Sequence, residues 1–337
     1  MVLHLDLGER GYDITVERGA LSRVGEIFSL GRRVLIVTDS GVPAVYAETV
    51  AAACKNAVIA TVDEGEGSKS FRVFEGLCRL LLDEGFTRSD CVVAVGGGVV
   101  GDLAGFVAAS YMRGIDFYNV PTTLLSQVDS SIGGKVAINL DSVKNIVGAF
   151  KQPRGVLIDP DVLLTLAPRQ ISAGLAEAVK MSLTSDADGF ALFEDGDVTE
   201  RLDEIIINAL KIKKSVVEED ECEGGLRKVL NFGHTVGHGI ESAAGLGGLL
   251  HGECVALGML PMCSQSVRAR LIPVLERFSL PTRIEADTDV ILEAMGHDKK
   301  LDGKQITAVY VSEIGSFEFL KMPVAELQSR VREALEK

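Results

Sequence analysis

The sequence predicts an α/β fold in which a parallel-sheet domain is followed by a mainly α-helical domain. Short, almost wholly apolar segments at residues 33–39, 57–62 and 91–95 alternate with helical stretches, which is typical of parallel strands covered on both faces. A glycine-rich loop follows the third segment, and beyond Pro168 the apolar residues recur with a helical period. The chain of 337 residues is long enough for two domains. We predict them at residues 1–155 and 156–337.

The elements of the N-terminal domain follow from local patterns. Residues 3–17 alternate apolar and polar positions about a glycine turn and predict a hairpin. A helix is expected after each of the three apolar strands, and residues 115–120 predict a further strand. Residues 151–160 contain Pro153 and Pro160 and are expected to be a linker.

The C-terminal domain is predicted to be mostly helical. Residues 171–183 are apolar and small except for Glu177 and Lys180, which stand three positions apart on one helix face. These two side chains are either a salt-bridged pair or part of a site. Further helices are expected at residues 198–217 and 252–269, followed by a hairpin of residues 305–311 and 316–322.

The glycine-rich loop indicates a variant Rossmann-like domain. Gly96, Gly98 and Gly101 fit the pattern G-x-G-x-x-G between a strand and a helix, the setting in which a pyrophosphate binds at a helix N-terminus. In the usual dinucleotide-binding fold these glycines follow the first strand, whereas here they follow the third. Glycines also allow close helix–strand packing, so both interpretations stay open. The polar segment 121–135 starts where a strand ends, which is where open α/β sheets bind ligands.

Three of the five histidines lie within residues 231–253, which suggests a metal site. His234 and His238 stand at i and i+4, so a helix places both on one face. This spacing suits two metal ligands, or one ligand beside a proton-transfer group. Imidazoles and carboxylates suit zinc, and a third ligand from another segment would leave a position open for substrate. The Glu that follows the first His in metalloproteases is missing, which argues against peptide hydrolysis.

Composition excludes several classes of function. The formal net charge of −14 argues against nucleic-acid binding. The six cysteines are scattered and indicate reduced thiols. The N-terminus lacks the pattern of a signal peptide, and no segment predicts a membrane span. We therefore expect a cytoplasmic protein.

Six motifs resemble those of the 3-dehydroquinate synthase family, within the sugar-phosphate cyclases, and they occur in the family's order over most of the chain. They are Gly-Glu-Gly-Ser-Lys-Ser (65–70), Gly-Gly-Gly-Val-Val-Gly-Asp-Leu-Ala-Gly-Phe (96–106), Pro-Thr-Thr-Leu-Leu-Ser-Gln-Val-Asp-Ser-Ser-Ile-Gly-Gly-Lys (121–135), Gly-Leu-Ala-Glu-Ala-Val-Lys (174–180), Gly-Leu-Arg-Lys-Val-Leu-Asn-Phe-Gly-His-Thr-Val-Gly-His (225–238) and His-Gly-Glu (251–253). The resemblance implies conversion of 3-deoxy-D-arabino-heptulosonate 7-phosphate into 3-dehydroquinate and phosphate, in the shikimate pathway of aromatic amino acid biosynthesis. It implies transient oxidation by NAD, phosphate elimination, re-reduction and aldol closure, and hence a lyase.

The resemblance also implies the site residues. Zinc, with cobalt or another divalent metal as alternatives, would be held by Glu177, His234 and His251, and His238 would lie near the substrate phosphate. The implied substrate contacts are Asp129, Lys135, Asn145, Lys180, Lys213, Arg227, Asn231 and one of Lys299 and Lys300. The implied NAD contacts are Glu66, Lys69, Gly97, Gly98, Val99, Asp102, Thr122, Thr123, Lys144 and Thr165. Arg113 would reach the phosphate from a partner subunit, which implies a homodimer.

Two segments depart from the family pattern, and other functions remain as alternatives. The usual Thr-Gly-Val-Asn-His-Pro is here Val-Ala-Ile-Asn-Leu-Asp (136–141), and the usual Lys-Tyr-Gly is Lys-Met-Ser (180–182). One alternative is another sugar-phosphate cyclase that takes a heptulose phosphate without a carboxylate. Others are a metal-dependent polyol dehydrogenase of the glycerol dehydrogenase type and a non-catalytic protein that binds NAD or a metal.

Overall fold

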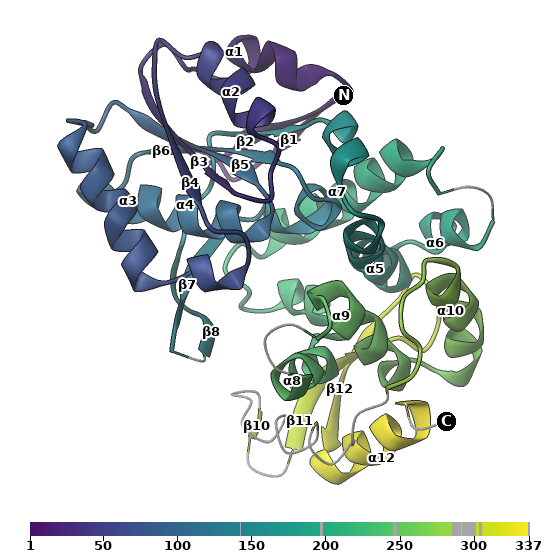
Figure 1. Cartoon of the computed structure of the whole chain (residues 1–337). Helices are drawn as coiled ribbons and strands as arrows, with labels where there is room; N and C mark the ends of the chain where they lie inside the picture. Colours follow the sequence, from purple (N-terminus) through teal and green to yellow (C-terminus); the bar gives the residue numbers. More distant parts are fainter. Residues whose placement is uncertain are drawn as a thin grey trace. The chain divides into compact units, whose positions relative to one another are not determined.

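A computed structural model describes residues 1–141, 143–195, 198–244, 248–284, 291, 301–302 and 305–335. The chain divides into two compact units, Met1–Leu166 and Ala167–Lys337 (Figure 1). The α/β fold class with a helical second part is confirmed. The boundary expected after residue 155 falls at the start of a strand that belongs to the first unit.

The first unit is built on a seven-stranded sheet in the order β1-β2-β9-β6-β5-β3-β4. Its strands are β1 (Val2–Leu5), β2 (Tyr12–Val16), β3 (Arg33–Asp39), β4 (Asn56–Val62), β5 (Cys91–Gly96), β6 (Asp116–Pro121) and β9 (Gly155–Ile158). β1 and β2 form the predicted antiparallel hairpin, and the other neighbouring strands pair in parallel. The linker expected at residues 151–160 was wrong, because β9 pairs there with both β2 and β6.

Successive side chains of the central strands enter opposite faces of this sheet. Val34 and Ile36 of β3 pack with α1 (Val24–Ile27) and α2 (Ala44–Ala52) on one face. Leu35 and Val37 pack on the other face with α3 (Phe71–Asp83) and α4 (Gly98–Ser110). Because both faces are covered, these strands are apolar throughout, as the sequence indicated.

The strand order creates a switch point between β3 and β5. The chain runs outward from β3 to β4 and then crosses back to β5, from which it continues through β6 to β9 in the opposite direction. Ligands of open α/β sheets bind outside the carboxyl ends of the strands at such a point. α4 begins there, directly after β5.

A second, two-stranded sheet follows β6. β7 (Lys135–Leu140) and β8 (Val143–Phe150) form an antiparallel hairpin that extends from the sheet of this unit (Figure 1). The segment that precedes it contains a π-helical turn at Ser126–Ser130, within the stretch that the sequence described only as polar.

The second unit consists mainly of helices. They are α5 (Pro168–Ser185), α6 (Ala187–Glu194), α7 (Leu202–Glu219), α8 (His234–Ala244), α9 (His251–Met259), α10 (Gln265–Arg277) and α12 (Val324–Leu335). A small sheet is formed by β10 (Leu301–Asp302), β11 (Gln305–Tyr310) and β12 (Glu318–Pro323), which include the predicted hairpin. The single helix expected at residues 252–269 was wrong. α9 ends before the 3-10 turn Leu260–Met262, and Ser264 caps α10 by accepting a hydrogen bond from the Val267 amide.

Among the described residues, no helix combines the length and the apolar character needed to cross a membrane.

Candidate metal centre and nucleotide site

Three helices of the second unit bring a carboxylate and two imidazoles together. Glu177 lies in the middle of α5, while His234 and His251 are the first residues of α8 and α9. The helices approach closely because of glycines: a Cβ on Gly252 would lie 2.0 Å from the Ala173 carbonyl oxygen of α5. A side chain at Gly252 would therefore push His251 away from Glu177.

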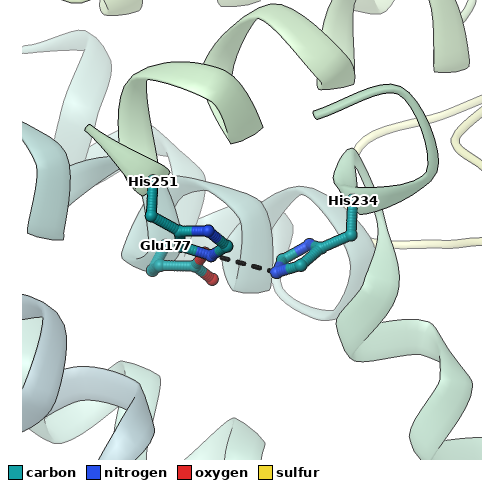
Figure 2. Close-up of side chains that lie close together, drawn as sticks. All are labelled: Glu177, His234 and His251. Atoms are coloured by element: carbon teal, nitrogen blue, oxygen red, sulfur yellow. Dashed lines mark ion pairs between the residues drawn. The ribbon is translucent and has the colours of Figure 1, made fainter. Parts of the chain in front are cut away.

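Both imidazoles direct their Nε2 atoms at the same carboxylate oxygen (Figure 2). Glu177 Oε1 lies 3.3 Å from His251 Nε2 and 3.7 Å from His234 Nε2. One ligand atom from each of the three residues lies within 4.8 Å of the others. His234 donates a hydrogen bond from Nδ1 to the Phe232 carbonyl oxygen at 3.1 Å, which leaves the Nε2 lone pair directed at Glu177.

The donor set fits a divalent metal. Glu177 is fully buried, and neither of its oxygens accepts a hydrogen bond from a described residue. Oε2 instead lies 2.5 Å from the ammonium of Lys180 in an ion pair. Buried polar atoms are normally hydrogen-bonded, so an oxygen that faces two imidazole nitrogens indicates the place of an ion. Two imidazoles and one carboxylate form a three-ligand set of the kind found in catalytic zinc sites.

The charges of the metal-free site are coupled. Burial would raise the pKa of the Glu177 carboxyl, but Lys180 and the two imidazoles hold it well below its usual range. Burial and the nearby ammonium lower the pKa of His234 well below its ordinary value. Burial would also lower the pKa of His251, but the carboxylates of Glu177 and Glu241 raise it to about 9. The metal-free site therefore holds a carboxylate and one neutral imidazole, His234, and the proton on His251 would be released when a metal binds.

His238 lies beside this group rather than within it. Its ring centroid is 5.2 Å from that of His234 and 6.1 Å from that of His251. The side chain is exposed. His238, Glu241 and His251 form a second trio whose ligand atoms also lie within 4.8 Å.

Among its described residues, the second unit also buries two lysines and an arginine. Lys180, Lys213 and Arg227 are 1%, 5% and 2% exposed. Lys180 donates a hydrogen bond at 2.6 Å to the carbonyl oxygen of Leu230, in the 3-10 turn Leu226–Asn231 that also carries Arg227. Asn231, the last residue of the turn, donates to Glu223 at 2.6 Å. A group of basic side chains can bind an anionic ligand through charge-assisted hydrogen bonds.

An ion pair that the sequence did not predict joins the starts of α5 and α9. Arg169 donates to both carboxylate oxygens of Glu253, at 2.6 and 2.7 Å. Glu253 also accepts a hydrogen bond from the Leu250 amide at 2.7 Å. Glu253 stands two residues after His251, so the pair fixes the start of α9 relative to the helix that carries Glu177. The His-Gly-Glu motif was the sequence feature that could have indicated a role for Glu253.

Arg169→Gln is expected to lower the free energy of unfolding by about 1–2 kcal/mol at pH 7, since Arg169 is half-exposed and its charge partly screened. Burial would raise the pKa of Glu253, but Arg169 and the Leu250 amide lower it. A carboxyl whose pKa is lowered by folding contributes stability above its unfolded value of about 4.3 and loses that contribution as the pH falls through the folded value. Urea unfolding should therefore show a difference from the unmodified protein that shrinks toward pH 3. The control is Arg270→Gln, which removes a similar two-oxygen pair with the more exposed Glu194. An equal loss of unfolding free energy in Arg169→Gln at pH 7 and at pH 3 would contradict the prediction.

In the first unit, packing explains three glycines of the loop at the switch point, of which Gly96 is the most crowded: a Cβ there would lie 2.6 Å from Val100 Cγ2. A Cβ on Gly97 would lie 2.9 Å from Thr123 Cγ2, and one on Gly98 would lie 3.1 Å from Ser130 Oγ. A Cβ on Gly101 would lie an ordinary 3.5 Å from Asn119 Oδ1, so packing does not explain Gly101. The backbone amides of the first turn of α4, including that of Val99, offer donors for a phosphate at this edge.

A polar network lies in the same unit. Lys69 is buried and donates to Asp102 of α4 at 2.6 Å and to Asn145 of β8. Asn139, which the sequence did not single out as a site residue, donates to Glu66 at 2.8 Å and accepts from the Asn145 amide at 2.8 Å. Asn145 takes a left-handed conformation with φ 54°, which asparagine tolerates better than most residues. The network connects the β7–β8 hairpin to α4 despite the departure from the family pattern.

The remaining predicted residues are placed as follows. The Thr122 amide donates to the Gly96 carbonyl oxygen at 2.9 Å, and Thr123 Oγ1 accepts from the Ser126 amide. Thr165 lies after β9 and is 3.0 Å from the Tyr46 hydroxyl of α2. Asp129 is in the π-helical turn, and exposed positions are taken by Arg113, Lys135 and Lys144. Lys299 and Lys300 lie outside the described residues.

Comparison with known structures defines the class of protein. The structure of 2-deoxy-scyllo-inosose synthase complexed with carbaglucose-6-phosphate, NAD+ and Co2+ matches with a TM-score of 0.91 and 28% identity over 99% of this chain and 100% of that one. The 2-epi-5-epi-valiolone synthase from Streptomyces hygroscopicus with NAD+ and Zn2+ bound matches with a TM-score of 0.86 and 27% identity over 96% of each chain. A probable glycerol dehydrogenase from Sinorhizobium meliloti, at 16% identity and a TM-score of 0.61, shares the fold alone. The fold is therefore that of the sugar-phosphate cyclases.

Sequence comparison is more specific. The family models for the 3-dehydroquinate synthase N-terminal and C-terminal domains match residues 59–173 and 174–301. The chain is 44% identical to a 3-dehydroquinate synthase of Enterococcus faecalis, over 98% of both sequences, and 42% identical to one of Streptococcus thermophilus, over 97% of this chain and 99% of that one. The chain belongs to the 3-dehydroquinate synthase family.

Proposed function

We propose that this chain is a lyase that converts 3-deoxy-D-arabino-heptulosonate 7-phosphate into 3-dehydroquinate and phosphate with NAD and a divalent metal, zinc or cobalt. The observation that carries the proposal is the buried Glu177 oxygen that faces two imidazole Nε2 atoms, in a member of this family. When bound, the metal supplies a Lewis acid for a substrate hydroxyl, and NAD supplies a reversible hydride acceptor. Glu177, His234 and His251 would hold the metal.

The buried cations support an anionic substrate. The heptulosonate phosphate carries a phosphate and a carboxylate, and Lys180, Lys213 and Arg227 would bind these groups in a chain whose net charge is −14. His238, exposed beside the trio, would donate a hydrogen bond to the phosphate and stabilise the charge that develops as it leaves. The proposed substrate contacts also include Asp129, Lys135, Asn145, Asn231 and one of Lys299 and Lys300.

The N-terminal unit would bind NAD at the carboxyl ends of β5 and β6. The start of α4 would accept the pyrophosphate, and Lys69 and Asp102, joined by their ion pair, would line this position. The other proposed contacts are Glu66, Gly97, Gly98, Val99, Thr122, Thr123, Lys144 and Thr165.

The protein would act as a homodimer in the cytoplasm. Arg113 is exposed and left-handed, with φ 67°, directly after Met112 with φ 50°. Such backbone strain persists when a function requires it, and the proposed function is to present the Arg113 guanidinium to the phosphate of a second subunit.

The test follows phosphate release and NADH absorbance together, with and without a chelator. We expect phosphate release from the heptulosonate phosphate that requires both NAD and metal, with no accumulation of NADH, because the hydride returns to the substrate in each turnover. Chelator should stop release, and added zinc or cobalt should restore it.

Other outcomes separate the alternatives. Accumulating NADH without phosphate release from a polyol would indicate a dehydrogenase. Phosphate release from a heptulose phosphate that lacks the carboxylate, and not from the acid, would indicate a different cyclase. Ligand binding without phosphate release and without accumulation of NADH would indicate a non-catalytic protein.

A further inference from the structure

His251 is contacted on both of its ring nitrogens by carboxylates from different helices. Its Nε2 faces Glu177 of α5 at 3.3 Å, and its Nδ1 lies 3.5 Å from Glu241 Oε2 of α8. Glu241 stands seven residues after His234, two turns along the same face of α8. The helix that begins with one imidazole of the trio therefore also reaches the other imidazole.

The two imidazoles of the trio are oriented in the same way. His234 donates from Nδ1 to the Phe232 carbonyl oxygen at 3.1 Å. A carboxylate can only accept a hydrogen bond, so His251 Nδ1 is likewise the donor toward Glu241. In both rings Nε2 is then the atom that would bind a metal beside Glu177, and in His251 the metal would replace a proton that faces the same carboxylate. Only the acceptor differs, a neutral carbonyl for His234 and a charged carboxylate for His251.

We propose that Glu241 is a positioning residue that orients His251 and increases the electron density on its Nε2 for the metal. The proposal rests on the proposed function, because it takes Glu177, His234 and His251 as the ligands. A carboxylate behind an imidazole ligand fixes its tautomer and ring orientation and raises its basicity, and removal of such partners lowers metal affinity about 10–100-fold. His251 requires this support because its side chain is 34% exposed, whereas that of His234 is 11% exposed.

An alternative role for Glu241 is direct coordination. His238, Glu241 and His251 could hold a second ion through Nδ1 of His251. The geometry favours the first trio, because its carboxylate is fully buried and its oxygens accept no hydrogen bond from the described residues, whereas Glu241 is partly exposed and paired with the Nδ1 proton. The two roles predict different metal stoichiometries.

The experiment titrates metal-free Glu241→Ala, Glu241→Gln and the unmodified protein with Zn2+ against a chromophoric chelator, without NAD or substrate. We expect Glu241→Ala to bind one zinc about 10–100-fold more weakly. Glu241→Gln keeps an acceptor oxygen but loses the charge, so its loss should be smaller. With saturating Co2+, the visible absorption bands of Glu241→Gln should shift, since the ligand field of His251 changes.

Glu194→Gln is the matched control. Glu194 is also a helical, ion-paired carboxylate of the second unit, and its side chain is 26% exposed against 19% for Glu241. Its variant should bind zinc like the unmodified protein. Thermal unfolding of the metal-free Glu241 variants should stay close to that of this control, which separates positioning from a general loss of fold.

Three outcomes would overturn the inference. Equal zinc affinity and an unchanged cobalt spectrum in Glu241→Gln would show that the carboxylate does not act on His251. If the unmodified protein binds two zinc ions and the Glu241 variants bind one, Glu241 is a metal ligand. If the unmodified protein binds no zinc and turnover ignores chelator, the proposed metal site fails and the inference fails with it; zinc binding and chelator-sensitive turnover with unaffected Glu241 variants would overturn the inference alone.

Discussion

His251→Ala is expected to lose both its metal and its turnover. The imidazole supplies one of only three proposed protein ligands, and a water molecule in its place would lack the orientation that α9 gives to the ring. Removal of an outer partner of a ligand already costs about 10–100-fold in affinity, so loss of the ligand itself should exceed that range. Metal content after dialysis should fall to background, and phosphate release should fall by more than about 100-fold.

The matched control is His4→Ala, which removes an exposed imidazole that is paired with Asp13 at 2.7 Å in the first unit. Its metal content and turnover should be unchanged. NAD binding by His251→Ala, measured by fluorescence or calorimetry, should be retained, because the proposed NAD contacts lie in the other unit. A fully metallated and active His251→Ala protein would disprove the ligand assignment.

The central strands β3 and β5 could be predicted because both are apolar on both faces. β3 and β5 contribute alternate side chains to the two clusters of buried residues, so burial leaves no room for the polar alternation of a one-sided strand. β9 was not predicted, because its surrounding sequence is typical of a loop. It has only four residues between Pro153 and Pro160, and prolines so close to a short apolar run are more typical of loops.

The break between α9 and α10 also had a local signal. Pro261 and Ser264 stand inside the segment that was expected to be one helix. Both are favoured at the start of a helix, and the apolar period continued across them. Periodicity alone therefore could not show that a new helix begins at Gln265.

At the candidate metal site, the spacing of residues along the sequence does not by itself identify the ligands. The i, i+4 pair His234 and His238 does share a face of α8, with ring centroids 5.2 Å apart, yet Glu177 faces His234 and His251 instead. Spacing describes one helix, whereas this arrangement depends on how three helices meet. Their distance is set by backbone contacts, such as that of Gly258 with the Gly233 carbonyl oxygen, which only the resemblance to a known family could anticipate.

Lys180→Met is expected to destabilise the metal-free protein much more than the metal-loaded one. The ammonium is 2.5 Å from Glu177 Oε2, and both side chains are buried. Removal of one partner of a buried ion pair leaves an uncompensated charge and costs about 3–5 kcal/mol. A bound metal would neutralise the same carboxylate, so zinc should restore part of this loss. Thermal and urea unfolding of the variant, with chelator and with saturating zinc, would measure both effects.

Lys214→Met separates burial from the loss of a lysine. Lys214 pairs with Glu218 at 2.7 Å on α7, but both side chains remain partly exposed, so its loss should cost about 0–1 kcal/mol and should not depend on zinc. If zinc stabilises Lys180→Met more than the unmodified protein, the metal and the ammonium compensate the same carboxylate. Equal stabilisation of both proteins would mean that the metal binds away from Glu177. This comparison measures stability, so it tests the position of the metal independently of catalysis. The turnover of Lys180→Met should be low, because the variant loses a proposed substrate contact.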